Sequence, residues 1–211
     1  MPVITSAKSE LLESIEPFSI RTGRLPGSQD LKRIGRLIIE LENESHRRID
    51  LARVGGLWEC VFTTSRFVLG LDKFPMLRLS AVYQDVTITN DGNAGSYFNI
   101  AELTRANRVR VLCGEYAIIG RSPSHLQMID VRYQWFYFAI RALKPYEGHQ
   151  TAAACLRSGD LRNCLRVPFH KAGWQRNTYV DDELRIVRGN EGGLFLLKRC
   201  DALSVILNAP S

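Results

Sequence analysis

The chain has 211 residues, of which 45% are hydrophobic and 24% are charged, and its formal net charge at pH 7 is +6. This length and composition are typical of one globular domain, and they exclude a disordered chain, a collagen and a small disulfide-rich scaffold. The positive charge favours an acidic partner, which would be a nucleic acid or an anionic membrane surface.

The first residues and the cysteines indicate where the protein acts. The N-terminal stretch "MPVITSAKSELLESIEP" is acidic and lacks the basic start and apolar core of a signal or transit peptide. No apolar run reaches the roughly 20 residues that a membrane-spanning helix needs, so we expect a soluble or peripheral protein. The five cysteines are an odd number without a CxxC pair, which favours buried, reduced thiols in an intracellular compartment.

Two amphipathic helices are predicted before residue 46. The first spans Thr5 to Glu16 and ends before Pro17, with its leucines and isoleucine at helical spacing. The second begins at Ser28, a favoured N-cap residue, and Asp30 suits the positive end of the helix dipole. The apolar stripe of the second helix consists of Leu31, Ile34, Leu37, Ile38 and Leu41.

From residue 55 onward the pattern changes to the two-residue period of β-strands. Polar and apolar residues alternate in "LWECVFTTS" and "SAVYQDVTITN". Further runs rich in β-branched and aromatic residues are "SYFNIAELT", "RVRVLCGEYAIIG" and "VRYQWFYFAIRAL". Residues 177–199 form two more runs around the turn "GNEGG". Serial strands with short turns predict an antiparallel barrel or sandwich.

Motifs for catalysis and for metal binding are sparse. The four histidines show no ligand spacing, and no cysteine or carboxylate cluster completes a metal site. Ser122 in "GRSPSH" lacks the second glycine of a nucleophile elbow, and "GNEGG" lacks the Lys-Ser/Thr of a phosphate-binding loop. The acidic residues 181–183 crowd the start of a strand and do not converge on a pocket. We therefore expect no enzyme, no metal and no cofactor.

Nucleic acid is not an expected partner. Arg105, Arg108 and Arg110 lie near Tyr97 and Phe98 in the sequence, which is the mixture that single-strand-binding surfaces use. The charges are dispersed through alternating strands, however, and no recognition motif accompanies them. A solvated strand face is favoured, and an anionic membrane surface is the acidic partner that we expect.

Several blocks of sequence, taken together, carry a family resemblance. They are "KSELLESI", "LIIELENES", "GGLWECVFTTSRFVLGLDKFP", "YQDV" and "GWQRNTYVDDELRIVRGNEGGLFLLKR". The last block contains Gly-Trp and then Thr-Tyr-x-Asp-x-x-Leu-Arg-Ile-x-Arg-Gly-Asn-x-Gly, between Gly173 and Gly192. In these blocks the chain resembles the plastid lipid-associated protein family, also called fibrillins or plastoglobulins, over nearly its whole length.

The resemblance implies a mainly β fold, a lipocalin-like antiparallel β-barrel preceded by two helices. It implies a single domain over residues 1–211, with helices in 5–46 packing on a barrel in 55–207. The implied function is non-enzymatic binding or organisation of lipids, carotenoids or prenylquinones, with a photoprotective or structural role at the thylakoid membrane or plastoglobules. Without a transit-like segment, we expect a cyanobacterial member at the cytoplasmic face of the thylakoid; the alternative location is the plastid stroma or plastoglobule.

The triplet Gly56-Leu57-Trp58 also resembles the GxW motif that opens the first strand of lipocalin-type barrels. In those barrels the tryptophan plugs the closed end, and an arginine from the last strands packs across it. Arg185 or Arg188 is expected in that role here. A guanidinium over an indole face contributes about 0.5–2 kcal/mol.

If Trp58 faces inward, strand alternation predicts that Cys60, Phe62 and Thr64 face inward too, and that Glu59 faces outward. A barrel of about eight strands either is filled by its own side chains or holds one small ligand. In the second case, the expected lining consists of Phe62, Thr64, Gln84, Tyr133, Trp135 and Phe136.

Two other functions are compatible with the same fold. One is a scaffold with a filled barrel, whose helix stripe from Leu31 to Leu41 docks a prenylquinone-pathway enzyme or a photosystem component at the thylakoid; it requires that stripe to be exposed. The other is a chromophore-handling enzyme such as a bilin lyase, which requires convergent titratable groups inside a cavity.

Overall fold

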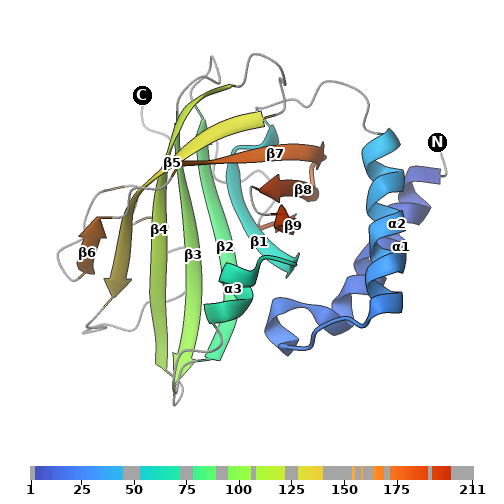
Figure 1. Ribbon diagram of the computed structural model, residues 1–211, viewed down its shortest axis with the longest axis horizontal. Helices are drawn as coiled ribbons and strands as arrows, with labels where there is room; N and C mark the ends of the chain where they lie inside the picture. Colours follow the sequence, from blue (N-terminus) through green and yellow to red (C-terminus); the bar gives the residue numbers. More distant parts are fainter. Residues whose placement is uncertain are drawn as a thin grey trace.

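The computed structural model of the protein describes residues 3–44, 53–71, 78–88, 95–105, 108–121, 128–139, 154, 158, 164–168, 172–189 and 192–200. In this part of the chain, helices near the N-terminus lie beside one curled antiparallel sheet (Figure 1). The prediction of a mainly β, antiparallel fold preceded by two helices is confirmed.

The element bounds follow the chain order. The helical elements are α1 (Val3–Ile15), the 3-10 helices η1 (Glu16–Phe18) and η2 (Ile20–Thr22), α2 (Ser28–Glu44) and α3 (Arg66–Gly70). The strands are β1 (Gly56–Thr63), β2 (Arg78–Ile88), β3 (Gly95–Arg105), β4 (Arg108–Arg121), β5 (Met128–Ala139), β6 (Cys164–Pro168), β7 (Ala172–Val180), β8 (Leu184–Gly189) and β9 (Leu194–Arg199).

Helix α2 begins at Ser28, as predicted, but Ser28 is not the residue that caps its first turn. The carboxylate of Asp30 accepts a hydrogen bond from the backbone N–H of Gly27 at 3.0 Å. The carbonyl of Gly27 accepts the bond from Leu31 N that closes the first turn. Asp30 therefore reaches back to the residue before the helix, as in a capping box, and Ser28 is already part of the helix.

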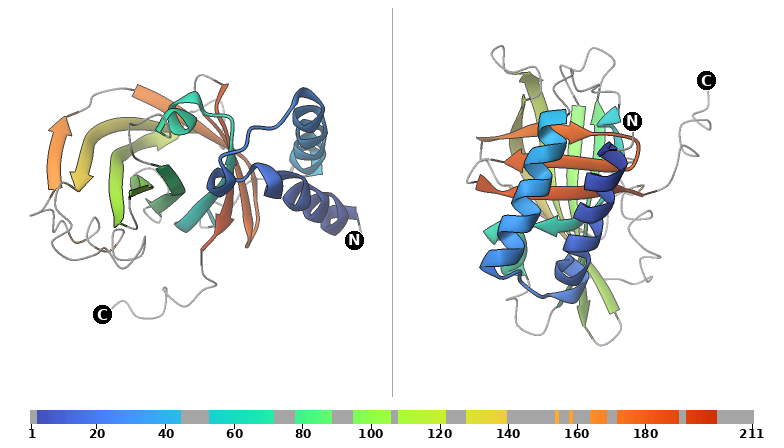
Figure 2. Two further views of the ribbon diagram at one scale, coloured as in Figure 1. Left: turned by 90° about the horizontal axis from the view of Figure 1, so that it is seen from below. Right: turned by 90° about the vertical axis from the view of Figure 1, so that its right-hand side faces the viewer.

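The strand pairings form a closed circuit, because the first strand of the order also pairs with a strand near its other end. Their order is β4-β3-β2-β1-β9-β8-β7-β5-β6, all antiparallel, and β4 also pairs with β5. This extra pairing joins the two arms of the sheet, which curls strongly (Figure 2). The predicted "GNEGG" turn does connect two antiparallel strands, β8 and β9. Gly192 there has φ of 74°, a conformation that favours glycine.

Both N-terminal helices pack on the convex face of the sheet, across β7, β8 and β9 (Figure 2). Buried side chains of the two layers form the helix-facing cluster, which contains Ala7, Leu11, Ile15, Ile34, Leu37, Ile38, Leu41, Phe62, Tyr179, Leu184, Ile186 and Leu196. Each large apolar side chain buried in this way stabilises the fold by about 1.5–3 kcal/mol relative to an exposed one. This cluster is what attaches the helices to the sheet.

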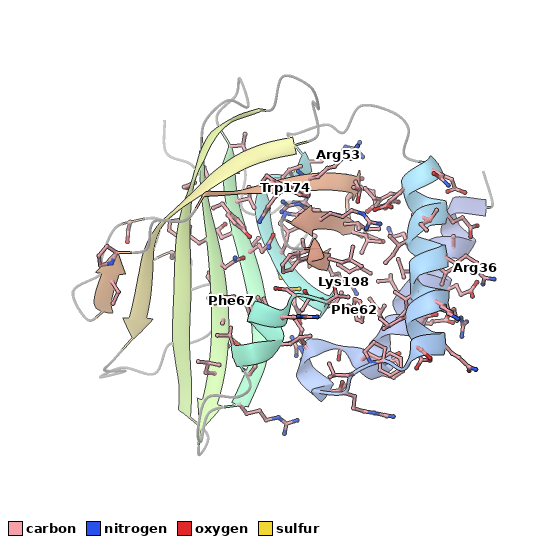
Figure 3. The ribbon with its side chains drawn as sticks, in the orientation of Figure 1. Arg36, Arg53, Phe62, Phe67, Trp174 and Lys198 are labelled. Atoms are coloured by element: carbon pink, nitrogen blue, oxygen red, sulfur yellow. The ribbon has the colours of Figure 1, made fainter. Side chains whose placement is uncertain are left out.

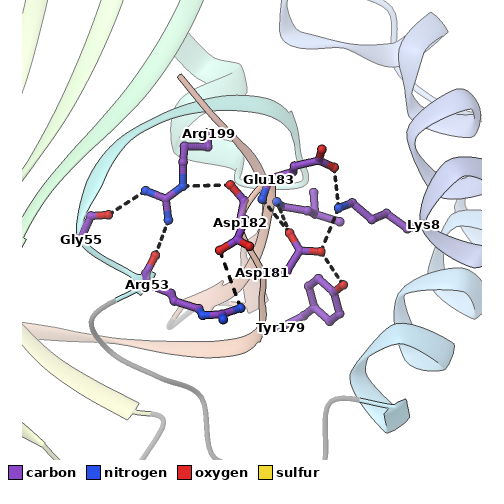
Figure 4. Close-up of polar contacts among 9 residues, drawn as sticks. Lys8, Arg53, Gly55, Tyr179, Asp181, Asp182, Glu183 and Arg199 are labelled. Carbon is purple, nitrogen blue, oxygen red and sulfur yellow. Dashed lines mark hydrogen bonds and ion pairs between the residues drawn. The ribbon is translucent and has the colours of Figure 1, made fainter. Parts of the chain in front are cut away.

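A polar anchor reinforces the contact between α1 and the β7–β8 turn (Figure 4). Lys8 Nζ lies 2.8 Å from Asp181 Oδ2 and 2.6 Å from Glu183 Oε2. Asp181 also accepts hydrogen bonds from the Tyr179 hydroxyl and from Leu184 N, each at 2.7 Å. The acidic residues 181–183 thus form a turn, and Asp181 and Glu183 anchor the helix to it.

A second group of buried side chains lies on the concave side of the sheet. This interior cluster includes Trp58, Cys60, Val82, Val86, Tyr97, Ala101, Leu103, Val187 and Leu197. These residues come from β1, β2, β3, β8 and β9, and Ile20, Val54, Val68 and Leu71 outside the strands belong to the same cluster. Gln84, Asn177 and Arg185 are polar side chains that are buried on this side of the sheet.

Candidate functional site

Trp58 occupies the centre of the candidate site, at the start of β1. Its side chain is fully buried, and its indole Nε1 donates a hydrogen bond to the Val54 carbonyl at 2.9 Å. Two guanidinium groups approach the ring: the Cζ atom of Arg199 lies 4.0 Å from the ring centroid, and that of Arg185 lies 5.9 Å away. Both distances are in the range of cation–π contacts.

Arg199 comes from β9, where it pairs in register with Trp58. Its guanidinium donates to three backbone carbonyls: Gly55 O at 3.0 Å, Arg53 O at 2.6 Å and Asp182 O at 3.0 Å (Figure 4). It therefore ties the segment before β1 to the β7–β8 turn. Burial lowers the pKa of Arg199 below its usual value, although the nearby aspartates oppose that shift.

Gly56 makes the close approach of Arg199 possible. Its φ is 113°, which side chains rarely tolerate. A Cβ at this position would lie 2.8 Å from Arg199 Nη1. The glycine of the GxW triplet is therefore required both by its backbone conformation and by the arginine beside it.

Arg185, from β8, is the charged group at the core of the site. It is only 1% exposed, and its Nε donates to Asn177 Oδ1 at 2.7 Å. Its Nη1 makes a longer contact of 3.4 Å with Gln84 Oε1. Burial lowers the pKa of Arg185 to about 10; the neighbouring Tyr97 hydroxyl opposes that shift, and the nearby charge of Arg199 adds to it. Arg185 is still protonated at neutral pH.

A chain of neutral polar groups continues from Arg185 across the interior. Gln84 Nε2 donates to the Tyr97 hydroxyl at 2.8 Å, and Gln175 Nε2 donates to the same oxygen at 2.6 Å. The hydroxyl in turn donates to Asn99 Oδ1 at 2.8 Å. Because the hydroxyl donates to Asn99, it accepts from the amide N–H of Gln84, and this orients Gln84 with its oxygen toward Arg185.

Asn177 leaves one donor of this chain unsatisfied. The side chain is fully buried, and its Oδ1 must face Arg185 because a guanidinium can only donate. Its Nδ2 consequently points elsewhere, and it has no hydrogen-bond partner. A buried amide N–H without a partner costs about 1–3 kcal/mol, so such a group calls for an explanation.

The sulfur of Cys60 borders the site on β1. It is buried, and its thiol contacts the carbonyl of Phe62 at 3.5 Å. Burial raises the pKa of the Cys60 thiol far above its usual value. The thiol is therefore protonated at neutral pH and is a poor nucleophile.

The residues expected to form the barrel floor separate into two groups. Trp58 and Arg185 come together as described, whereas Arg188 lies on the opposite face of β8 and binds Glu42 of α2 at 2.8 Å and 2.9 Å. Arg199, which the sequence argument did not name, lies closer to Trp58 than Arg185 does. The signal that was available is the "KR" pair at the end of the last apolar run.

The residues expected to line the interior also lie in different parts of the structure. Gln84 is buried in the site, but Phe62 belongs to the helix-facing cluster and points toward the helices (Figure 3). The pairing of β1 with β9 shifts register between Cys60 and Phe62, so Val61 is an extra residue that reverses the alternation. Thr64 follows β1 and exchanges hydrogen bonds with Leu194, through its backbone N–H and its side-chain oxygen.

The remaining three lining candidates lie in β5. The backbone of Tyr133, Trp135 and Phe136 pairs with β4, and that of Trp135 and Phe136 also pairs with β6. Their side chains lie outside the described part of the structure. The same holds for the side chains of Arg105, Arg108 and Arg110.

The described residues contain no group of three or more His, Cys, Asp and Glu side chains arranged to hold a metal ion. None of their helices combines the length and the apolar character that crossing a bilayer requires.

Comparison with known proteins gives a consistent result. The chain matches the family model PAP_fibrillin over residues 5–198, which run from within α1 to within β9. It is 26% identical over 197 residues to the Arabidopsis thaliana protein named "Probable plastid-lipid-associated protein 5, chloroplastic". That alignment covers 92% of this chain and 69% of the plant protein. No solved structure matches.

Proposed function

The chain belongs to the PAP/fibrillin family, and we propose from this that it is a non-enzymatic, lipid-associated protein that binds or organises apolar molecules. The candidates are lipids, carotenoids or prenylquinones. The proposed place of action is the thylakoid membrane, at its cytoplasmic face in a cyanobacterium, or the plastoglobules and stroma of a plastid, where the role is photoprotective or structural. The name of the plant relative, which describes it as chloroplastic, supports this placement.

The observation that carries the proposal is the family match over both layers of the fold, together with the composition of the concave face. Apolar side chains of the interior cluster surround a few buried polar groups there. Binding sites for small apolar molecules have this character, with apolar walls and a few polar groups that fix the orientation. Trp58 under an arginine of the last strand supports a lipocalin-like arrangement as part of the proposal.

A peripheral contact with an anionic membrane is the second part of the proposal. Exposed basic side chains occur on the N-terminal elements, namely Arg21, Arg24, Lys32, Arg33 and Arg36. Arg21 is paired with Glu59, and Arg33 and Arg36 lie near Glu10. Each lysine or arginine close to an anionic bilayer is worth about 1 kcal/mol, so a few are enough for reversible association. Exposed Leu25 lies in the same region and adds apolar contact area.

The two alternative functions receive less support. The scaffold hypothesis needs the apolar stripe of α2 on the surface, but Ile34, Leu37 and Leu41 are at most 2% exposed, against the sheet. A bilin lyase needs convergent titratable groups inside. Among the described residues of the interior, Arg185 is paired with neutral amides and the Cys60 thiol is protonated, which is not an acid–base pair.

Extraction of the natively purified protein tests the proposal. The protein is extracted with organic solvent, and mass spectrometry identifies what is released; we expect a lipid, carotenoid or prenylquinone in stoichiometric amount. Flotation with anionic liposomes at low and high salt tests the membrane contact, which salt should weaken. A protein that yields no apolar molecule and binds no liposomes in either condition would overturn both parts.

A further inference from the structure

Arg185 is a buried cation that has no anionic partner among the described side chains. Among the described residues, the ion pairs involve other basic side chains and none involves Arg185. Its two hydrogen-bond acceptors are the amide oxygens of Asn177 and Gln84, which carry no formal charge. A charge removed from water is strongly destabilised unless it is paired, so this position has an unmet requirement for negative charge.

Arg185 and the neighbouring Asn177 amide also have hydrogen-bond donors that the described contacts do not use. A guanidinium has five N–H donors, and Arg185 uses two in the contacts described above. One of those two, to Gln84, is long at 3.4 Å, so another oxygen can compete for it. Asn177 Nδ2 is a further buried donor, on the amide that is bonded directly to Arg185, and it has no partner.

The single positive charge of Arg185 can be neutralised by a ligand that carries one negative charge. Arg199, the other cation near Trp58, is already bound to three backbone carbonyls. In the described part of the chain, Arg185 is the cation that faces the interior with unused donors, and it pairs in register with Leu197 of the interior cluster. A planar guanidinium binds a carboxylate through two parallel hydrogen bonds, which is the geometry that makes this pair strong.

We propose that the concave side of the sheet binds the carboxylate head group of an apolar-chain acid, with Arg185 and Asn177 Nδ2 as its donors. This inference rests on the proposed function, because it assigns the chemical class of the molecule that the interior takes. The carboxylate supplies the missing negative charge and accepts the unsatisfied amide N–H. The apolar chain lies against the interior cluster.

A displacement experiment on the full-length protein tests the assignment. A neutral fluorescent naphthylamine probe is bound first and is then displaced by palmitic acid or by methyl palmitate, at a pH at which the acid is ionised. We expect the acid to compete about tenfold better than the ester, because charge-assisted hydrogen bonds are roughly twice as strong as neutral ones. Equal competition by acid and ester would overturn this inference and leave lipid binding in place, whereas failure of both would overturn lipid binding itself.

The variant N177D separates this site from a merely structural arginine. The substitution conserves shape and places a carboxylate directly beside Arg185. We expect it to raise the melting temperature of the ligand-free protein and to remove the preference for acid over ester. A lower melting temperature, or an unchanged preference, would contradict the proposal.

The matched control is N43D, which makes the same chemical change at an exposed position of α2. Asn43 is not part of the interior, so N43D should keep the preference for the acid. Loss of the preference in both variants would overturn the assignment to Arg185 and Asn177. Acetate is the last arm: stabilisation by acetate as strong as by palmitate would overturn the requirement for an apolar chain.

Discussion

At the residue scale, Trp58 is flanked by two arginines that have very different surroundings. Arg199 donates to three backbone carbonyls, and the carboxylates of the β7–β8 turn lie near it. Arg185 is bonded only to neutral amide oxygens, and the charge of Arg199 acts against it. Both arginines therefore contact the same indole ring. Arg199 holds backbone segments together, whereas Arg185 is a cation that lacks a counter-charge.

Replacing Arg199 should cost more stability than replacing Arg188. R199M loses the backbone hydrogen bonds and the cation–π contact, and we expect the free energy of unfolding to fall by about 2–4 kcal/mol. R188M loses an ion pair with Glu42 in which the arginine side chain is 43% exposed, and we expect a loss of about 1 kcal/mol or less. Urea unfolding of both variants measures the difference, and equal losses would show that the clamp does not contribute.

Glycine at position 56 provides a second residue-scale prediction. G56A forces a Cβ against Arg199 and a strained φ, and it should lower the free energy of unfolding by about 1–3 kcal/mol. G35A is the control: Gly35 lies inside α2, and an added Cβ would meet nothing within 4 Å. There we expect a gain of about 0.5–1 kcal/mol, because alanine favours the helix. Thermal unfolding should move the two melting temperatures in opposite directions.

At the scale of single elements, the attachment of α1 combines apolar packing with one partly buried ionic group. Burial by itself would raise the pKa of Asp181, but hydrogen bonds from Lys8, Tyr179 and the turn backbone hold it below its ordinary value of 3.8. Burial by itself would lower the pKa of Lys8, but its bonds to Asp181 and Glu183 raise it above 10.5. Both directions mean that the folded state favours the ionised pair.

The stability of this contact should therefore depend on pH at both extremes. For Asp181 the stabilisation is full above its ordinary pKa and is lost as the pH falls through the lower, folded value. For Lys8 it is full below its ordinary pKa and is lost as the pH rises through the higher, folded value.

K8M should remove part of this pH dependence and about 1–2 kcal/mol of the free energy of unfolding at neutral pH. Urea unfolding at a series of pH values measures the effect, with K32M on the exposed face of α2 as the control. If K8M kept the full loss of stability in acid and in alkali, the pair with Asp181 would not be its source.

At the scale of the whole molecule, the helix layer and the sheet share one apolar core. Leu37 of α2 lies in the same cluster as Phe62, Ile186 and Leu196 of the sheet. Elements that bury their apolar faces only against each other are expected to unfold together.

L37A should test that expectation. Removing this buried side chain leaves a cavity and should cost about 2–5 kcal/mol. Far-ultraviolet circular dichroism and tryptophan fluorescence should report one coincident transition, at a lower urea concentration than in the unmodified protein. The control I39A, on the exposed side of the same helix, should change stability by about 0.5 kcal/mol or less. Helix unfolding that precedes loss of the fluorescence signal would show that the two layers are independent.

The periodicity of the sequence predicted the helices and strands, but it did not predict which side chains form the candidate site. Helix α2 was predicted because its buried residues repeat along one face, and the hairpin at "GNEGG" because its turn needs glycine. Phe62 was placed on the wrong face because simple alternation contains no information about the extra residue at Val61. Arg199 was missed because its contact with Trp58 depends on the register between β1 and β9, which are distant in the chain and become neighbours only in the folded sheet.

The way β5 is paired bears on how the protein behaves at high concentration. One side of this strand pairs first with β7 and then with β6, so both halves of that side are occupied. β6 ends the strand order, has five residues and finishes at Pro168, which has no N–H to offer. Long unpaired strands recruit other molecules and start aggregation, and a short strand with a terminal proline discourages this. Crowding of many copies should therefore not lead them to join through this edge of their sheets.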